Sequence, residues 1–393
     1  MRRVAVVAAG LAGLVTGSLA AFALQTEPRP ALPASETRPE VPLPGGDSGV
    51  LLVWTSGGLP AGLAGDIGRI PGVTAVTSVA GGRLDLVRSA GGDGRALDRP
   101  PPGLAIALDA IAVDVATYPP FVPAGVRDAF ASLAPGEALL GATSASLRRM
   151  EAGGSIELAQ GGRLTVAAVV PDGTVGAAEV VVPSHWAQDA GVLRTPRYAL
   201  VSYRGDRAPI DTAVRNAVAD RLPVRIRGPG ETPFVREGDA VLPQALIKLR
   251  FGEFASVPGS GTDLVQDPAW VADNIVTADV PLLGRVHCHR SLVPALRGAM
   301  RELADRNLAF LVDAVSFGGC WVPGVVPSGE APSRHAWGVA FDLNQRKNMT
   351  GVTSTQDPRL VEVLARWGFT SGADWLVPDA AYFEYVRPPD PRR

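Results

Sequence analysis

Two residues in one short phrase have the types and the spacing of metal ligands. In SRHAWGVAFDLN (333–344), His335 precedes Asp342 by seven residues, with the small Gly338 and Ala340 between them. A turn from a loop into a strand brings an imidazole and a carboxylate together at this spacing, and such nitrogen and oxygen donors suit Zn²⁺. Taken alone, a single His/Asp pair is more often a hydrogen-bonded core pair, so the phrase has to be interpreted in its context.

The elements expected around this phrase are a strand and two helices. Apolar residues alternate with small or polar ones from 339 to 343, which is the period of a strand. A helix is predicted over 291–307, and a second one begins with an Asp-Pro pair and runs over 357–367. The first helix places four apolar residues on one face: Leu292, Leu296, Met300 and Leu303.

The region 47–235 is predicted to be a separate α+β module with frequent Gly and Pro turns. Short apolar runs predict its strands, and amphipathic stretches between them predict its helices. The predicted strands are 51–54, 74–77, 84–87, 164–169, 179–182 and 198–203, and the predicted helices are 123–133 and 210–222. The predicted fold class of the chain is therefore α+β.

The N-terminal segment indicates export. Two arginines precede a predominantly apolar, uncharged run over 4–24, so residues 1–25 are predicted to be a transmembrane anchor. A cleaved signal peptide is the alternative, because Ala21-Phe22-Ala23 fits the A-x-A pattern of a cleavage site. The proline-rich residues 26–46 predict an extended linker. We expect a single-pass protein of the cell membrane with extracytoplasmic domains, or else a secreted one.

Composition narrows the set of partners. The net charge of −2 leaves no broadly basic surface for nucleic acid, so no nucleic-acid partner is expected. The two cysteines, Cys288 and Cys320, predict one disulfide because an exported chain folds in an oxidising compartment. Two buried free thiols are the alternative. Nothing in the composition indicates an oligomeric state.

The C-terminal region, residues 245–393, resembles a known peptidase family. SRHAWGVAFDLN is similar to the S-x-H-x-x-G-x-A-x-D signature of the D-alanyl-D-alanine carboxypeptidase and L-alanyl-D-glutamate endopeptidase family of zinc metallopeptidases. The resemblance continues in FGEF (251–254), NIV (274–276), VHCHR (286–290), FGGCWVP (317–323) and RWGFTSGADWLVPDAAYFEY (366–385). It implies an α+β zinc-peptidase-like domain with a small antiparallel sheet. In the middle region, IGRIPGVTAVTSVAGG and VPDGTVGAAEVVVP faintly resemble extracytoplasmic domains of ABC-type permeases.

The resemblance implies a role for each matching residue. His335 and Asp342 match the first two zinc ligands of the family. Asp379 matches the general base that takes a proton from the zinc-bound water. Ser333 and Glu384 are implied to support the ligands through hydrogen bonds.

Two positions depart from the family pattern. Tyr382 stands where members carry the third ligand, a His, and Gly324 stands where they commonly carry an Arg. Two side chains alone rarely hold zinc. A phenol can ligate zinc only if the metal drives its deprotonation, because its ordinary pKa is about 10. His287 and His289 are the alternative ligands in this region.

These residues lead to competing functional predictions. The first is an exported, membrane-tethered zinc peptidase that acts on peptidoglycan stem peptides as a carboxypeptidase or endopeptidase. The second is a pseudoenzyme that binds wall peptide or a protein partner without hydrolysing it. A third is a scaffold in which the middle module makes the main contacts. His335, Asp342 and Asp379 favour the enzyme, whereas Tyr382 and Gly324 favour the pseudoenzyme.

Overall fold

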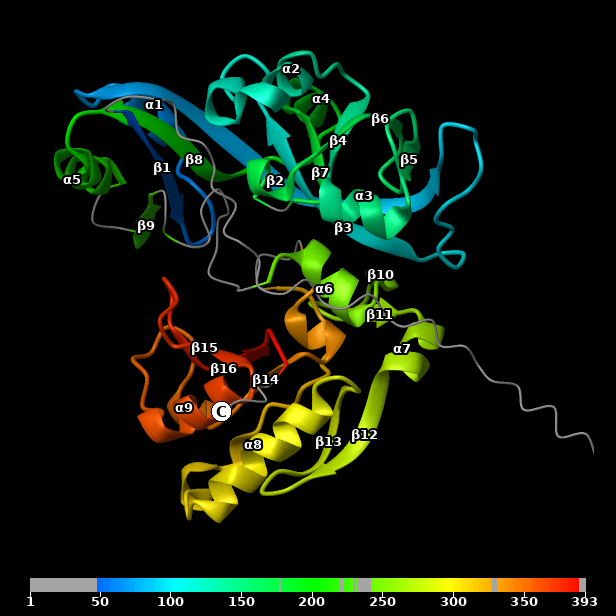
Figure 1. Ribbon diagram of the computed structural model, residues 1–393, viewed down its shortest axis with the longest axis vertical. Coiled ribbons are helices and arrows are strands. Elements are labelled where there is room, and N and C mark those ends of the chain that lie inside the picture. The colour runs from blue at the N-terminus through cyan, green and yellow to red at the C-terminus, as the bar shows by residue number, and fades with distance from the viewer. Residues whose placement is uncertain are drawn as a thin grey trace, which may run out of the picture. The chain divides into compact units, whose positions relative to one another are not determined.

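The computed structural model describes residues 48–176, 178–218, 222–228, 231, 242–326 and 331–388 (Figure 1). These residues form a mixed fold of helices and sheets, which agrees with the predicted α+β class. The predicted anchor or signal peptide at 1–25 and the predicted linker at 26–46 lie outside the described residues. Among the helices of the described ranges, none combines the length and the apolar character needed to cross a bilayer.

The largest sheet in the described part of the chain has eleven strands in the order β11-β10-β3-β7-β4-β6-β5-β2-β8-β1-β9. Neighbouring strands are antiparallel except for the parallel pairs β3–β7 and β4–β6. Its strands are β1 (Ser48–Thr55), β2 (Val73–Ala90), β3 (Ala105–Val113), β4 (Glu137–Gly141), β5 (Ser155–Leu158), β6 (Arg163–Val170), β7 (Val180–Pro183), β8 (Thr195–Arg204), β9 (Val224–Arg227), β10 (Ala255–Pro258) and β11 (Leu264–Gln266). Strands β10 and β11 follow residue 245 in the sequence, yet β10 pairs with β3.

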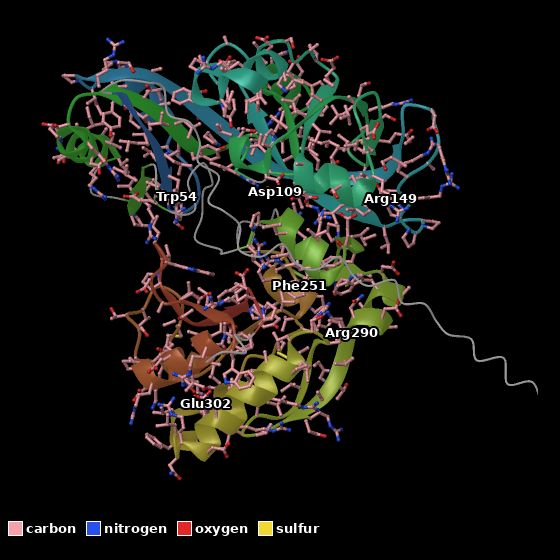
Figure 2. The ribbon with its side chains drawn as sticks, in the orientation of Figure 1. Trp54, Asp109, Arg149, Phe251, Arg290 and Glu302 are labelled. Carbon is pink, nitrogen blue, oxygen red and sulfur yellow. A yellow bond between two sulfur atoms is a disulfide. The ribbon has the colours of Figure 1, made fainter. Side chains whose placement is uncertain are left out.

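Strand β2 differs from the prediction of two strands, at 74–77 and 84–87, because it is one strand of 18 residues. Gly81 and Gly82, between the two predicted strands, lie inside it. A Cβ atom at Gly81 would lie 2.5 Å from the side chain of Arg197, so the glycine leaves room for that side chain. Arg197 is held by Asp109 on β3 at 2.7 Å (Asp109 is labelled in Figure 2).

Short helices cover the large sheet, and the chain's apolar runs fill the space beneath them. These helices are α1 (Leu63–Gly68), α2 (Arg127–Ala131), α3 (Ala142–Arg148), α4 (Ser184–Asp189) and α5 (Arg207–Val218). Helices predicted at 123–133 and 210–222 correspond to α2, with the 3₁₀ turn before it, and to α5. The described residues also form 3₁₀ helices at Pro119–Phe121, Ala124–Val126, Asp172–Thr174, Ala309–Leu311, Ala314–Ser316, Arg334–Trp337 and Gln345–Lys347.

The C-terminal part contains a β-hairpin and a small antiparallel sheet in the order β14-β16-β15. Its elements are α6 (Gln244–Phe251), α7 (Pro268–Asn274), β12 (Ile275–Val280), β13 (Gly284–His289), α8 (Val293–Asp305), β14 (Ala340–Asp342), α9 (Pro358–Arg366), β15 (Phe369–Gly372) and β16 (Asp379–Tyr385). One apolar core extends from Leu242 to Tyr385 through these elements. The predicted apolar face of α8 is fully buried in it.

Helices α8 and α9 pack closely against each other because of one glycine. A Cβ atom at Gly298 on α8 would overlap the ring of Trp367 at the end of α9. The same indole donates its Nε1–H to Glu302 of α8 at 2.8 Å (Glu302 is labelled in Figure 2). Helix α9 begins as predicted, with the Asp357 carboxylate accepting a hydrogen bond from the Arg359 backbone N–H at 2.8 Å. These two helices support the sheet that carries the candidate site.

Candidate functional site

The phrase 333–344 folds as a capped turn followed by strand β14. Ser333 caps the 3₁₀ helix Arg334–Trp337, because its side-chain oxygen accepts a hydrogen bond from the His335 backbone N–H at 3.3 Å. Gly338 ends the helix with a φ of 66°, and a Cβ atom there would lie 2.8 Å from the backbone nitrogen of His289. The turn therefore requires glycine both for its backbone conformation and for space. It directs the His335 and Asp342 side chains toward each other.

His335 and Asp342 have the geometry of two ligands of one ion. His335 Nε2 lies 3.6 Å from Asp342 Oδ1, which is too long for a hydrogen bond. His335 Nδ1 lies 3.3 Å from the carbonyl oxygen of Cys320, and because a carbonyl only accepts, Nδ1 carries the proton. In the tautomer that makes this bond, the other ring nitrogen, Nε2, faces the carboxylate. Bond lengths of about 2.0–2.1 Å in a tetrahedral zinc site separate two ligand atoms by about 3.3 Å, close to this spacing.

Tyr382 occupies the neighbouring position on strand β16. It is the cross-strand partner of Asp342, so both side chains lie on the same face of the sheet. Its ring meets that of His335 edge-on at 5.6 Å between centroids and contacts Trp375 at 4.8 Å. Its hydroxyl donates to Glu384 Oε2 at 3.3 Å, and Glu384 Oε1 accepts the backbone N–H of Leu242 at 3.3 Å. The phenol is thus hydrogen-bonded to a fully buried carboxylate.

The surroundings of Tyr382 keep its phenol protonated. Burial raises the pKa of Tyr382 well above its ordinary value, and the nearby Glu384 carboxylate raises it further. Arg334 opposes this shift, whereas Asp342 adds to it. A phenolate in this place would face two carboxylates in a buried environment. Tyr382 is therefore a hydrogen-bond donor here, and a poor candidate for an anionic metal ligand.

Asp379, the first residue of β16, lies within electrostatic range of both His335 and Asp342. Its carboxylate accepts a hydrogen bond from Thr350 Oγ1 at 3.1 Å and one from the backbone N–H of Tyr382. Burial raises the pKa of Asp379, and the negative charge of Asp342 raises it too, while His335 lowers it. This carboxyl group therefore takes up a proton more readily than an ordinary Asp.

The loop 317–326 completes the site by holding the pair in place. The backbone N–H of Gly318 donates to the Asp342 carbonyl at 2.9 Å, and that of Val322 donates to the His335 carbonyl at 3.1 Å. A disulfide joins Cys288 on β13 to Cys320, the residue whose carbonyl orients the His335 ring. Gly324, at the position of the family's Arg, brings no charge to this loop.

Three other basic side chains of the region, Arg334, His287 and His289, form hydrogen bonds with other groups. Arg334 donates to the carbonyl of Leu242 at 2.8 Å. His287 lies on the exposed side of β13, with Nδ1 3.3 Å from Thr277 Oγ1. His289 is buried, and its Nε2 lies 3.1 Å from the carbonyl oxygen of Phe251, which is labelled in Figure 2. Its Nδ1 accepts a hydrogen bond from the backbone N–H of Ser291 at 3.1 Å. The rings of both alternative ligands, His287 and His289, are thus hydrogen-bonded to other groups.

The donor set does not fit the family's three-ligand zinc site. His335 and Asp342 supply two suitable atoms, and the third position supplies a protonated phenol bonded to Glu384. Within the described ranges, no group of three or more His, Cys, Asp or Glu side chains is placed to hold a metal ion. The structure brings His335, Asp342, Asp379 and Tyr382 together. Ser333 accepts a hydrogen bond from the backbone of His335, and Glu384 accepts one from the Tyr382 hydroxyl.

Three contacts of this site were not foreseen from the sequence. Leu242 acts through its backbone, which has no sequence signal, and it lies 142 residues from Glu384. Thr350 and Trp375 reach the site from loops before and after helix α9. Trp375 lies in the phrase GADW, which is part of the family resemblance, so the sequence did indicate that this segment belongs to the site region.

Comparison with known proteins finds a family match within the C-terminal part. Residues 328–385 match the family model described as D-alanyl-D-alanine carboxypeptidase, which confirms the predicted resemblance for this segment. The matched segment contains His335, Asp342, Asp379 and Tyr382. Among curated proteins, none matches the chain.

Two solved structures are similar to part of the chain at low identity. The extracellular domain of the noncanonic ABC-type transporter YknZ from Gram-positive bacteria has 10% identity and a TM-score of 0.29, covering 43% of this chain and 90% of that one. The periplasmic region of MacB from Actinobacillus actinomycetemcomitans has 8% identity and a TM-score of 0.32, and the match covers 49% of this chain and 92% of that one. The first of these is the extracellular domain of an ABC-type transporter, and the second is a periplasmic region.

Proposed function

We propose that the C-terminal region binds the stem peptide of peptidoglycan at the surface formed by His335, Asp342 and Asp379, without hydrolysing it. The family match of residues 328–385 supports this class of ligand. In this proposal the chain is exported and held at the cell membrane by residues 1–25, and the linker 26–46 gives the folded part reach toward the wall.

One observation carries the choice of binding over hydrolysis. Tyr382 stands opposite Asp342, where the third ligand of a zinc peptidase belongs, and its hydroxyl is bonded to the buried Glu384. A catalytic zinc site of this type needs three protein ligands and an open position for water. The pair of His335 and Asp342 alone leaves such an ion weakly held.

The same surface is suited to the polar groups of a peptide. Asp342 and Asp379 present carboxylate oxygens beside Nε2 of His335, so this surface is rich in hydrogen-bond acceptors. Acceptors of this kind bind the amide N–H and ammonium groups of a peptide. Trp375, packed on Tyr382, offers an apolar face beside them.

Calorimetric titration with a synthetic pentapeptide ending in D-Ala-D-Ala tests the proposal. We expect binding to the purified chain in the presence of EDTA, with no release of D-alanine. Asp342→Asn should weaken binding about 10-fold or more, because hydrogen bonds to a charged group contribute about 1.5–3 kcal/mol. Asp305→Asn, an exposed change on α8, is the matched control and should leave the affinity unchanged. Absence of binding would refute the proposal.

The active peptidase is the second candidate, and two observations favour it. The 3.6 Å spacing of His335 Nε2 and Asp342 Oδ1 suits a shared ion. The pKa of Asp379 is raised by burial and by Asp342, as expected of a group that exchanges protons. Release of D-alanine by the wild-type chain, abolished by EDTA and by Asp379→Asn, would establish this candidate in place of binding alone.

A further inference from the structure

The segment from Leu242 to Glu253, which contains α6, contacts both the large sheet and the candidate site. Its central residue, Lys248, is one of two lysines in a chain of 393 residues with 37 Lys and Arg in total. The Lys248 ammonium is buried, with three acceptors within hydrogen-bond distance. They are Glu179 Oε2 at 2.9 Å, the Ala107 carbonyl at 2.6 Å and Glu253 Oε1 at 2.9 Å.

These contacts use all the donors of the ammonium group. A lysine side chain has three N–H bonds and no acceptor, so three acceptors satisfy it. Arg, which the chain uses at nearly every other basic position, has a planar guanidinium with its donors in a fixed fork. An ammonium group instead directs three donors from one atom, which suits the three acceptors around Lys248.

Two further side chains fix α6 to the large sheet. Gln244, on the same face of the helix, donates to the Ala107 carbonyl and to Glu179 Oε1, each at 2.9 Å. Glu253, just after the helix, accepts two hydrogen bonds from the buried Arg148 of α3, each at 2.8 Å. Burial alone would raise the pKa of Glu253, but Lys248 and Arg148 lower it to about 2, so the contact stays ionised at neutral pH.

Leu242, at the start of the same segment, forms hydrogen bonds with Glu384 and Arg334 beside the candidate site. The Leu242 backbone N–H donates to Glu384 Oε1 at 3.3 Å, and its carbonyl accepts from Arg334 at 2.8 Å. Glu384 in turn accepts the Tyr382 hydroxyl. Because Leu242 lies two residues before α6 and Lys248 lies within it, a shift of the helix on the sheet would move the contacts of both residues.

A buried cluster of charges is a costly way to attach a helix if stability is the only requirement. Burying ion pairs is often neutral or unfavourable compared with apolar packing, but it admits one alignment of the partners, whereas an apolar surface tolerates several. We propose that Lys248 is a positioning residue: through Glu179 it fixes the alignment of α6, so that Leu242 holds Glu384, and through it Tyr382, in place. The large sheet thereby sets the geometry of the candidate site.

This inference rests on the proposed function, but its test measures the conformation at Tyr382 in the absence of any peptide. The full chain is prepared with 3-fluorotyrosine at position 382, and its ¹⁹F resonance is recorded for wild type and Lys248→Met. Met keeps the length and apolar stem of Lys and removes its three donors. We expect the resonance to shift by more than its line width or to split. Lys347→Met, at the other and exposed lysine, is the matched control and should leave it unchanged.

A second variant guards against simple unfolding. Lys248→Met with Glu179→Gln removes both members of one ion pair and leaves no unpaired charge between them. A 3-fluorotyrosine label at Tyr203, which belongs to an apolar cluster of the large sheet away from α6, reports any general loss of packing in the protein. A shift at 382 with an unchanged label at 203 supports the positioning role. An unchanged resonance at 382 in either folded variant, or equal shifts at both labels, would overturn it, whatever peptide titrations show.

Discussion

The substitution Tyr382→His tests most directly how the site was altered. Tyr382 faces Asp342 across the strand pair, and its ring lies 5.6 Å from that of His335. An imidazole is shorter than a phenol, so we expect its nitrogen to end nearer the pair than the Tyr382 hydroxyl, which reaches Glu384. The change should therefore supply the third nitrogen or oxygen donor that zinc requires.

The expected gain in zinc affinity follows from the number of ligands. Zinc sites with four protein ligands bind with about 10–16 kcal/mol at neutral pH, which is about 2.5–4 kcal/mol for each ligand. One additional ligand should thus raise the affinity about 100-fold to 1,000-fold. The gain requires that His335 and Asp342 be already oriented, which their 3.6 Å spacing and the bond from His335 to the Cys320 carbonyl indicate.

Competition with a chromophoric zinc chelator measures this gain. Tyr382→Phe removes the hydroxyl without adding a ligand, so it should bind zinc no better than wild type. Adding Asp342→Asn to Tyr382→His should abolish most of the gain. If Tyr382→His bound zinc no more tightly than wild type, or if Tyr382→Phe gained equally, the idea that Tyr382 replaces a ligand of a preformed pair would be wrong.

Three more changes test other parts of the structure. Cys288→Ser should lower the free energy of unfolding by about 3–4 kcal/mol, as measured in urea without reductant, because the bridge to Cys320 closes a long loop. Gly298→Ala should lower it by about 1–3 kcal/mol, seen as a lower Tm, because the new methyl overlaps Trp367. Asp379→Asn should raise the Tm at pH 7 but not at pH 3: its pKa is raised in the folded state, so ionisation of Asp379 destabilises the fold only as the pH rises.

The sequence predicts the elements of the site because their patterns are local. The Asp-Pro pair at 357–358 marks the start of α9, and alternation over 339–343 marks strand β14. The four apolar residues of the helix predicted at 291–307 are all buried. In each case a few consecutive residues determine the conformation, since a cap, a proline or a periodic apolar face acts within one or two turns.

Contacts between distant segments could not be predicted in this way. The pairing of β10 with β3 joins residues about 150 positions apart, and nothing in the phrase ASVP indicates its partner. The two strands predicted at 74–77 and 84–87 form one continuous strand, β2. Gly81 inside it leaves room for the side chain of Arg197, a residue of β8 more than 100 positions later in the sequence.

Tyr382, which departs from the family pattern, and Glu384, which matches it, are joined by a hydrogen bond in the site. A fully buried carboxylate is unfavourable unless donors surround it, and Glu384 has two, the phenol of Tyr382 and the backbone N–H of Leu242. Tyr382, at the position of the third ligand in the proposed site, is thus also a donor that satisfies this carboxylate. Leu242 owes its position to α6, which Lys248 anchors to the large sheet. The state of the metal-ligand position in the C-terminal part is therefore tied, through Glu384, to contacts made by the rest of the chain.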